Sequence, residues 1–152
     1  MATFEITVDD REVQDALRRL GDKASDLTPA MKQIGEYLRF RTEENFMGEQ
    51  TPEGQAWQKL SPKTEANKAK KKGINMILQD TGDLRGSIAY EAGARSVKIG
   101  TNVMVGGYSL GAIHNYGAPA RNIPARPFLG VSNDDRAEIT QILLDYLNQI
   151  EN

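Results

Sequence analysis

The side chains that most often carry catalysis are scarce in this sequence. It holds one histidine, His114, and no cysteine. The missing cysteines exclude a disulfide framework, a thiolate metal site and a cysteine nucleophile, and a single histidine excludes a zinc site built on several imidazoles. A Ser/His/Asp triad would have to use His114, but no G-x-S-x-G segment is present to expose a serine. We therefore interpret His114 as a structural histidine that hydrogen-bonds the backbone.

The acidic pairs and the glycine-rich stretch also lack the geometry of a reactive site. Glu43-Glu44 and Asp134-Asp135 are neighbours in the chain. Neighbours on a helix point about 100° apart, so neither pair forms a two-carboxylate site by itself. Gly106-Gly107 has neither the spacing nor the lysine of a phosphate-binding loop, which favours a turn. The sequence predicts no enzyme and no catalytic, cofactor-binding or metal site; a magnesium site assembled from distant carboxylates stays open, without specific residues to support it.

The charges are unevenly distributed along an otherwise ordinary composition. The chain has 152 residues, of which 39% are hydrophobic and 26% charged, with a net charge of −2, which fits a single globular domain over 1–152. Residues 59 to 72 combine one acid with six lysines, namely Lys59, Lys63, Lys68, Lys70, Lys71 and Lys72. Such a run either contacts nucleic acid or an acidic protein, or forms a solvated loop. We favour the loop, because the pI near 5.5 argues against a dedicated duplex-DNA binder.

Nothing in the sequence points to a membrane. No apolar run approaches the roughly 18 residues of a membrane span. The N-terminus has neither the basic region nor the apolar core of a signal peptide. We therefore expect a protein made in a cytoplasm, with no membrane partner.

Hydrophobic periodicity predicts a strand and two helices in the first third of the chain. Residues 4–8 alternate between apolar and polar, which is typical of a short half-buried strand. Asp9 or Asp10 is placed to cap the helix that follows. Thr28, followed by a proline, predicts the cap of a second helix that runs to about residue 45. Arg41 interrupts the apolar stripe of this helix, so it either snorkels or forms a pair.

Strand signals gather in the second half. Residues 87–91 and 96–100 alternate on either side of a turn, which predicts a hairpin, and Val103 and Val105 extend it into a meander over about 87–105. Residues 123–129 contain two prolines, so they form an edge strand or an extended arm.

The last helix is the clearest in the chain. Ser132 opens it, with Asp135 as a capping-box partner, and a short helix is expected over 108–116. Because helices and strands are segregated, the fold class is α+β: an antiparallel sheet from the N-terminal strand, the meander and an edge strand near 123–129, packed by N-terminal helices and a C-terminal helix. A basic segment at about 48–76 separates the second predicted helix from the predicted hairpin, and we expect this segment to be mobile. Within it, a short lysine-rich helix is expected to begin at about residue 62.

Two features are hard to explain by folding alone. Trp57 lies in a loop, where it is either a core anchor or an interface hot spot, and we favour the anchor. In the arm, Arg126 and Phe128 fall on one side of an extended chain. The arm docks on a neighbouring subunit or leads rigidly into the last helix. If it docks, replacing both side chains by alanine is expected to leave the fold intact.

The sequence resembles the phage virion morphogenesis family, also called the tail completion proteins of tailed phages and prophages. Three blocks carry the resemblance: P-E-G-Q-A-W-Q-K-L at 52–60, I-L followed by T-G-D-L-R-G-S-I at 77–88, and I-H-N-Y-G with I-P-A-R-P-F-L-G at 113–130. The order and spacing of the blocks agree over nearly the whole chain. The most specific is P-A-R-P-F-L-G after I-H-x-x-G.

The resemblance implies a non-enzymatic assembly protein without cofactors, acting at the head-proximal end of a tail. It implies a homo-oligomeric ring, often of six subunits in related proteins, that can be monomeric before assembly, with DNA only in passage. The other partners are tail tube and neck proteins, and the location is the virion tail or neck, with assembly in the host bacterial cytoplasm. The implied subunit or partner contacts are Trp57, Leu84, Arg85, His114, Pro124, Arg126, Pro127 and Phe128. The implied basic contact segment contains Lys63, Lys68, Lys70, Lys71 and Lys72. The alternatives are a neck adaptor between head and tail and, from a different class, a small nucleic-acid-binding protein that uses the lysines.

Overall fold

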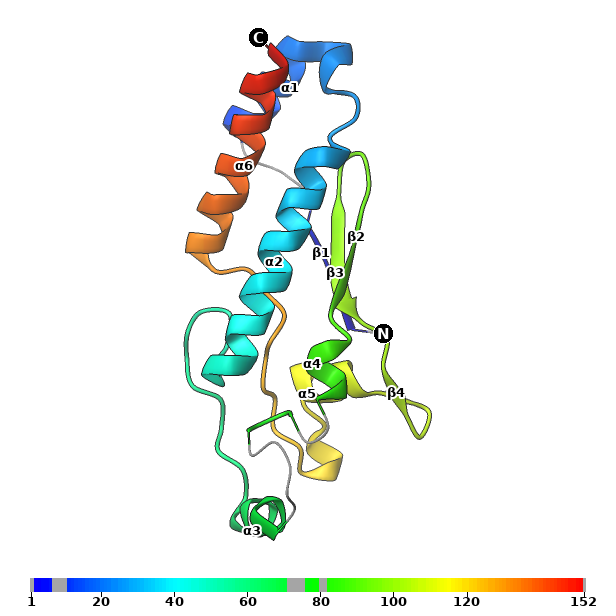
Figure 1. Ribbon diagram of the computed structural model, residues 1–152, viewed down its shortest axis with the longest axis vertical. Helices are drawn as coiled ribbons and strands as arrows, with labels where there is room; N and C mark the ends of the chain where they lie inside the picture. The colour runs from blue at the N-terminus through cyan, green and yellow to red at the C-terminus, as the bar shows by residue number, and fades with distance from the viewer. Residues whose placement is uncertain (1, 7–10, 71–75, 80–81, 152) are drawn as a thin grey trace.

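One long helix lies between a small sheet and a second helical layer. The computed structural model describes residues 2–6, 11–70, 76–79 and 82–151. Figure 1 shows an elongated molecule in which α2 (Thr28–Gly48) runs between the sheet on one side and α6 (Asn133–Glu151) on the other. At one end α1 (Arg11–Leu20) and the 3-10 helix η1 (Gly21–Ala24) pack against α6. This segregation of helices and strands confirms the α+β class.

The main sheet has three antiparallel strands in the order β1–β3–β2. The outer strands β1 (Ala2–Ile6) and β2 (Ala89–Ala92) both pair with the central β3 (Val97–Thr101). α2 packs against β2 and β3. The predicted N-terminal strand and the predicted hairpin are therefore confirmed. The expected continuation of the first strand to residue 8 lies outside the described residues, and so do Asp9 and Asp10, the predicted caps of the helix that follows.

Two predicted extensions of the sheet are wrong. Instead of joining it, β4 (Met104–Val105) pairs with β5 (Tyr108–Ser109) in a separate two-stranded hairpin. Gly106 and Gly107 both have positive φ, +57° and +83°, and close this hairpin with a tight turn that glycine adopts without strain. The 123–129 segment is an extended arm rather than an edge strand, with a single bridge between Ala118 and Ile123. Its prolines lack the N–H donors that a ladder needs.

The remaining short helices lie toward the opposite end of the molecule from α1. They are α3 (Pro62–Lys70), α4 (Asp83–Gly86), α5 (Leu110–Tyr116) and the 3-10 helix η2 (Pro119–Arg121), with α3 outermost in Figure 1. The predicted helix after residue 61 is confirmed, and the helix expected over 108–116 is observed from Leu110, because Tyr108 and Ser109 form β5. Within the described ranges, no helix combines the length and the hydropathy needed to cross a bilayer.

The start of α2 differs from its prediction. Thr28 is the first residue of the helix rather than its cap. The Asp26 carboxylate accepts a hydrogen bond from the Thr28 backbone N–H at 3.0 Å and thereby satisfies one of the free donors at this end. The Thr28 hydroxyl also donates to this carboxylate, and the two hydrogen bonds, the hydroxyl's first, lower the pKa of Asp26. The sequence had two acceptor side chains close together, and periodicity does not decide between them.

A buried carboxylate joins α2 to α6. Asp135 is 1% exposed and accepts hydrogen bonds from Tyr37 Oη at 2.7 Å, Arg41 Nε at 2.8 Å and the Ser132 backbone N–H at 2.9 Å. Ser132 Oγ accepts in return from the Asp135 N–H, which confirms the predicted capping box. Burial alone raises the pKa of Asp135, but these hydrogen bonds together outweigh it and lower the pKa. Of the two expectations for Arg41, pairing is the one observed.

Candidate functional site

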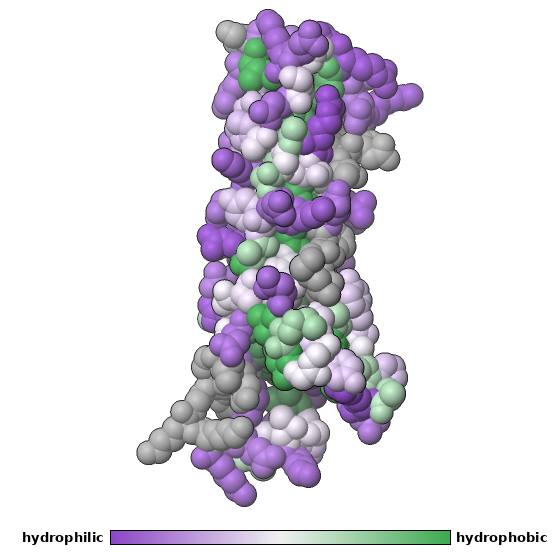
Figure 2. Space-filling model, turned by 90° about the vertical axis from the view of Figure 1, so that its right-hand side faces the viewer, coloured by the Kyte–Doolittle hydropathy of each residue, from purple (hydrophilic) through white to green (hydrophobic). Residues whose placement is uncertain are grey.

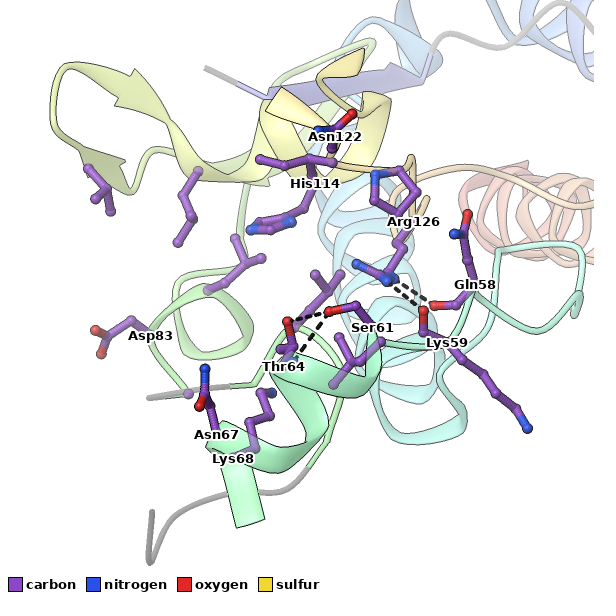
Figure 3. Close-up of a pocket in the computed structure, with 18 of the residues that line it drawn as sticks. Gln58, Lys59, Ser61, Thr64, Asn67, Lys68, Asp83, His114, Asn122 and Arg126 are labelled. Carbon is purple, nitrogen blue, oxygen red and sulfur yellow. Dashed lines mark hydrogen bonds between the residues drawn. The ribbon is translucent and has the colours of Figure 1, made fainter. Parts of the chain in front are cut away.

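The proline-containing arm ahead of α6 is fastened to the segment around Trp57. Trp57 Nε1 donates a 2.7 Å hydrogen bond to the Pro127 carbonyl. The Arg126 guanidinium donates to the carbonyls of Gln58 at 2.8 Å and Lys59 at 3.2 Å, as Figure 3 shows. Arg126 is only 6% exposed, and this burial lowers its pKa. These bonds attach the arm to its own chain.

An aromatic cluster completes the attachment. Phe128 is fully buried, with its ring centroid 4.9 Å from that of Phe46, and Trp57 packs edge-on against the same Phe46 ring at 5.8 Å. The Asn115 side-chain oxygen accepts hydrogen bonds from the backbone N–H groups of Phe128 and Leu129 at 3.0 and 3.1 Å. The buried backbone of the arm thus finds its partners without a sheet. In this structure Trp57 is a core anchor.

The burial of the arm corrects one expectation. Arg126 and Phe128 were expected to face a neighbour, so that replacing both by alanine would leave the fold intact. Both side chains are instead buried within this chain. Removing a fully buried phenylalanine typically costs about 3–5 kcal/mol, so that double variant is expected to lose stability.

A groove with a volume of about 970 Å³ opens between α3, α4, β4 and α5. Its apolar lining comes from segments far apart in the sequence and includes Leu60, Leu78, Leu84, Val103, Leu110 and Ile123. Pro124 and Arg126 of the arm form part of its wall. Figure 3 shows Asn67 and Lys68 of α3 across the opening from His114 of α5. The groove therefore unites residues from all three blocks of the sequence resemblance.

His114 behaves differently from its prediction. Its side chain points into the groove in Figure 3, and its Nδ1 atom is buried without a hydrogen-bond partner in the part of the chain described. Its backbone carbonyl accepts a hydrogen bond from the Arg126 N–H of the arm at 2.7 Å. Burial, with a smaller contribution from the Arg126 cation, lowers the pKa of His114. The interpretation as an imidazole that hydrogen-bonds the backbone is therefore wrong for Nδ1, which is enclosed by the protein.

The other expected contact residues divide into two groups. Leu84 is buried on α4, beside the groove, while Arg85 forms an ion pair with Glu43 at 2.6 Å. Lys68 lines the groove and donates to the Met76 carbonyl at 2.6 Å. The two fully exposed lysines on α3 are outside the groove, and none of the residues of that helix is buried. They are Lys63 and Lys70, whereas Lys71 and Lys72 lie outside the described residues.

Sequence reasoning missed two exposed apolar surfaces. On the β4–β5 hairpin, Met104, Val105 and Tyr108 are 56%, 57% and 52% exposed. Figure 2 shows hydrophobic surface gathered in the lower half of the face toward which this hairpin projects in Figure 1. On α2, Phe40 and Met47 are 59% and 52% exposed. For the hairpin, the available signal was the pair of glycines between apolar residues. For α2, it was the spacing of seven residues between Phe40 and Met47. Neither signal shows that these side chains are exposed until the packing around them is known.

The described residues contain no group of three or more His, Asp or Glu side chains placed to hold a metal ion. What the arrangement offers is a groove with a large apolar lining, a few cations beside it and an unpaired imidazole nitrogen. Such a surface can bind another protein segment through apolar contacts. The groove is therefore a candidate binding surface.

The comparison with known proteins agrees with the sequence resemblance. The chain matches the phage virion morphogenesis family over residues 8–148 and belongs to that family. It is 30% identical over 141 residues to Mu-like prophage FluMu G protein 2 of Haemophilus influenzae, covering 90% of this chain and 89% of the relative. It is 28% identical over 149 residues to Mu-like prophage FluMu G protein 1 of the same organism, covering 97% of each. No solved structure matches the chain significantly. These matches support a role in phage virion morphogenesis.

Proposed function

We propose that this chain is a structural, non-enzymatic subunit that completes the phage tail and takes part in joining it to the head. Membership of the phage virion morphogenesis family supports the assembly role. The Mu-like prophage relatives, which align over most of their own length, support a phage or prophage origin. The protein acts in the virion, at the tail or neck, after assembly in the host cytoplasm.

The observation that carries this proposal is the exposed hairpin beside the groove. Three large apolar side chains of β4 and β5 are more than half exposed, and one of them, Val105, also lines the groove. Val105 and Tyr108 are direct cross-strand partners, and exposed apolar side chains gathered on one short hairpin favour protein–protein contact. A subunit that repeats the same contact head to tail closes a ring if the rotation allows it. We therefore propose a homo-oligomeric ring, with tail tube and neck proteins as the further partners.

The charges support contacts between copies within the ring. α3 exposes lysines and buries none of its residues, while α6 exposes acids such as Asp134, Glu138 and Asp145. Opposite charges on two surfaces steer association and fix its register. The alternative assignment, a neck adaptor, uses the same surfaces at a different layer of the particle.

Electron microscopy of particles from a phage that lacks this gene tests the proposal. Separate filled heads with unjoined or overlong tails are the expected result, and tail length divides a terminator from a joining factor. Complementation with the wild-type gene is the control. Intact infectious particles without the gene would exclude the morphogenesis role, and salt-sensitive DNA binding by the α3 lysines would then favour the nucleic-acid alternative.

A further inference from the structure

α2 carries an apolar stripe that its own chain leaves uncovered. Glu36, Phe40, Glu43 and Met47 are spaced by four, three and four residues, so they lie on one line along the helix. We call this line the outer face of α2. It lies opposite the buried stripe that contains Leu38 and the other core residues of the helix. Phe40 and Met47 are both more than half exposed and about 10 Å apart along the axis.

The outer face is acidic as well as apolar. Glu36 and Glu43 have exposed side chains next to Phe40 and Met47, each paired with one arginine of the same chain, Arg39 and Arg85 respectively. Glu44 on the next row adds a third carboxylate, paired with Arg41. Pairs this exposed contribute little to stability, so these carboxylates are available to a second cation.

The groove has the complementary character. Its floor is apolar, and among the described residues that line it the charged ones are the cations Lys59, Lys68 and Arg126 and the acid Asp83. In Figure 3 the Lys59 side chain extends away from the groove, and Lys68 lies at its opening. No α2 residue lines the groove, so the outer face of a chain does not fill that chain's own groove.

We propose that the groove of one copy receives the outer face of α2 from a second copy, with Phe40 and Met47 as the two anchors. The inference rests on the proposed ring subunit and names its interface. A helix that lays apolar side chains spaced by seven residues into a groove is a recurrent mode of recognition. Among the described residues, the other large exposed apolar side chains lie on the hairpin beside the groove or, in the case of Tyr116, at the end of α5. The outer face of α2 is therefore the surface that is both apolar and acidic.

This contact joins two different surfaces, so it repeats. Each copy offers one groove and one outer face, and the contact is heterologous. Such a contact generates a ring or an open filament, whereas a contact between two outer faces would stop at a dimer. The exposed hairpin extends the acceptor surface, since Val105 belongs to both hairpin and groove.

Cysteine cross-linking tests the contact directly, because the chain has no cysteine of its own. The Phe40→Cys and Asn67→Cys proteins are mixed and oxidised with copper phenanthroline over a range of concentrations. Asn67 is exposed at the groove. We expect a disulfide-linked dimer from the mixture, and much less from either protein alone. Tyr116→Cys mixed with Asn67→Cys is the matched control, since Tyr116 is 64% exposed and lies outside both surfaces.

Two results would overturn the proposal. One is the absence of the mixed product up to the highest soluble concentration. The other is a mixed product no stronger than the control or weaker than the homodimer of Phe40→Cys, which would indicate that outer faces meet each other.

A phage assay separates this inference from the proposed function. The Phe40→Asp/Met47→Asp variant changes two exposed residues and is expected to fold. Loss of anchors of this kind weakens association about 30-fold or more, so we expect it to fail in restoring virions to the gene-deleted phage. If it restores them as well as wild type, the docking is wrong while the tail function stands. If the deletion itself yields normal virions, the proposed function is wrong.

Discussion

The carboxylate that joins α2 to α6 gives the sharpest test of what holds the fold together. Asp135→Asn keeps the size of the side chain but removes its charge. Asp135 is 1% exposed and accepts from Tyr37, Arg41 and Ser132. The amide leaves the Arg41 cation without a buried counter-ion and replaces one accepting oxygen by an NH2 donor.

The magnitude follows from burial. Removing one partner of a buried ion pair costs about 3–5 kcal/mol. Arg41 keeps Glu44 and its side chain is 26% exposed, so the lower end, about 3 kcal/mol, is expected. The matched control is Glu44→Gln, which removes the other partner of Arg41. The Glu44 side chain is 43% exposed, and its loss is expected to cost about 0–1 kcal/mol.

Urea denaturation measures both variants. With a slope of about 2 kcal/mol per molar urea, Asp135→Asn should lower the midpoint by about 1.5 M and Glu44→Gln by less than about 0.5 M. Equal losses from the two variants, or a loss below about 1 kcal/mol for Asp135→Asn, would refute the assignment of this carboxylate as the main polar link between the helices.

The same carboxylate predicts a pH dependence. The hydrogen bonds lower the pKa of Asp135 in the folded state below its ordinary value of 3.8. Its contribution is therefore complete above that ordinary value and is lost as the pH falls from 3.8 through the folded pKa. The free energy of unfolding of wild type should fall in that acid range, and Asp135→Asn should show a shallower fall. An identical acid slope for both proteins would contradict the argument.

Three further predictions concern other contacts. Because the chain has one histidine, its imidazole signal in NMR reports His114 alone; burial should place that pKa below 6.5, and a value at or above 6.5 would contradict the burial. Because the folded state holds His114 neutral, the free energy of unfolding should decrease as the pH falls below 6.5, and His114→Gln should remove this decrease. Phe128→Ala should lower stability by about 3–5 kcal/mol in urea denaturation, and a loss under about 1 kcal/mol would contradict its place in the core. Gly35→Ala should destabilise although alanine favours helices, since its Cβ would meet the Tyr90 ring at 2.3 Å; Gly86→Ala, with no atom within 4 Å, is the control, and equal melting temperatures would refute the close approach of α2 and β2.

The sequence predicted those elements whose signal is local. The period of the last helix, its capping box and the alternation of the hairpin strands depend on residues a few positions apart, and all are observed. The start of α2 was misplaced because Asp26 and Thr28 are equally good local acceptors. The separate β4–β5 hairpin was missed because sheet membership depends on which strand a segment meets in space, and β3 is already paired on both edges.

The candidate site could be predicted only in part. The resemblance named Leu84, His114 and Arg126 as contact residues, and all three line the groove. It did not predict how they are arranged there. Arg126 donates its hydrogen bonds to backbone carbonyls, and Phe128 packs against Phe46. Both contacts join segments more than 65 positions apart in the sequence, so local patterns could not predict them. The sequence does not show that Phe40 and the hairpin tip are exposed, because their exposure depends on how the other elements of the fold pack around them.

We propose that this chain completes the phage tail as a ring at its upper end. Cryo-electron microscopy of purified virions tests it most directly, through the density at the junction of tail and head. The claim predicts a ring of copies of this fold at that junction, each with α2 against the groove of its neighbour. A virion that lacks the chain, or that carries it elsewhere than the tail or neck, would contradict the claim.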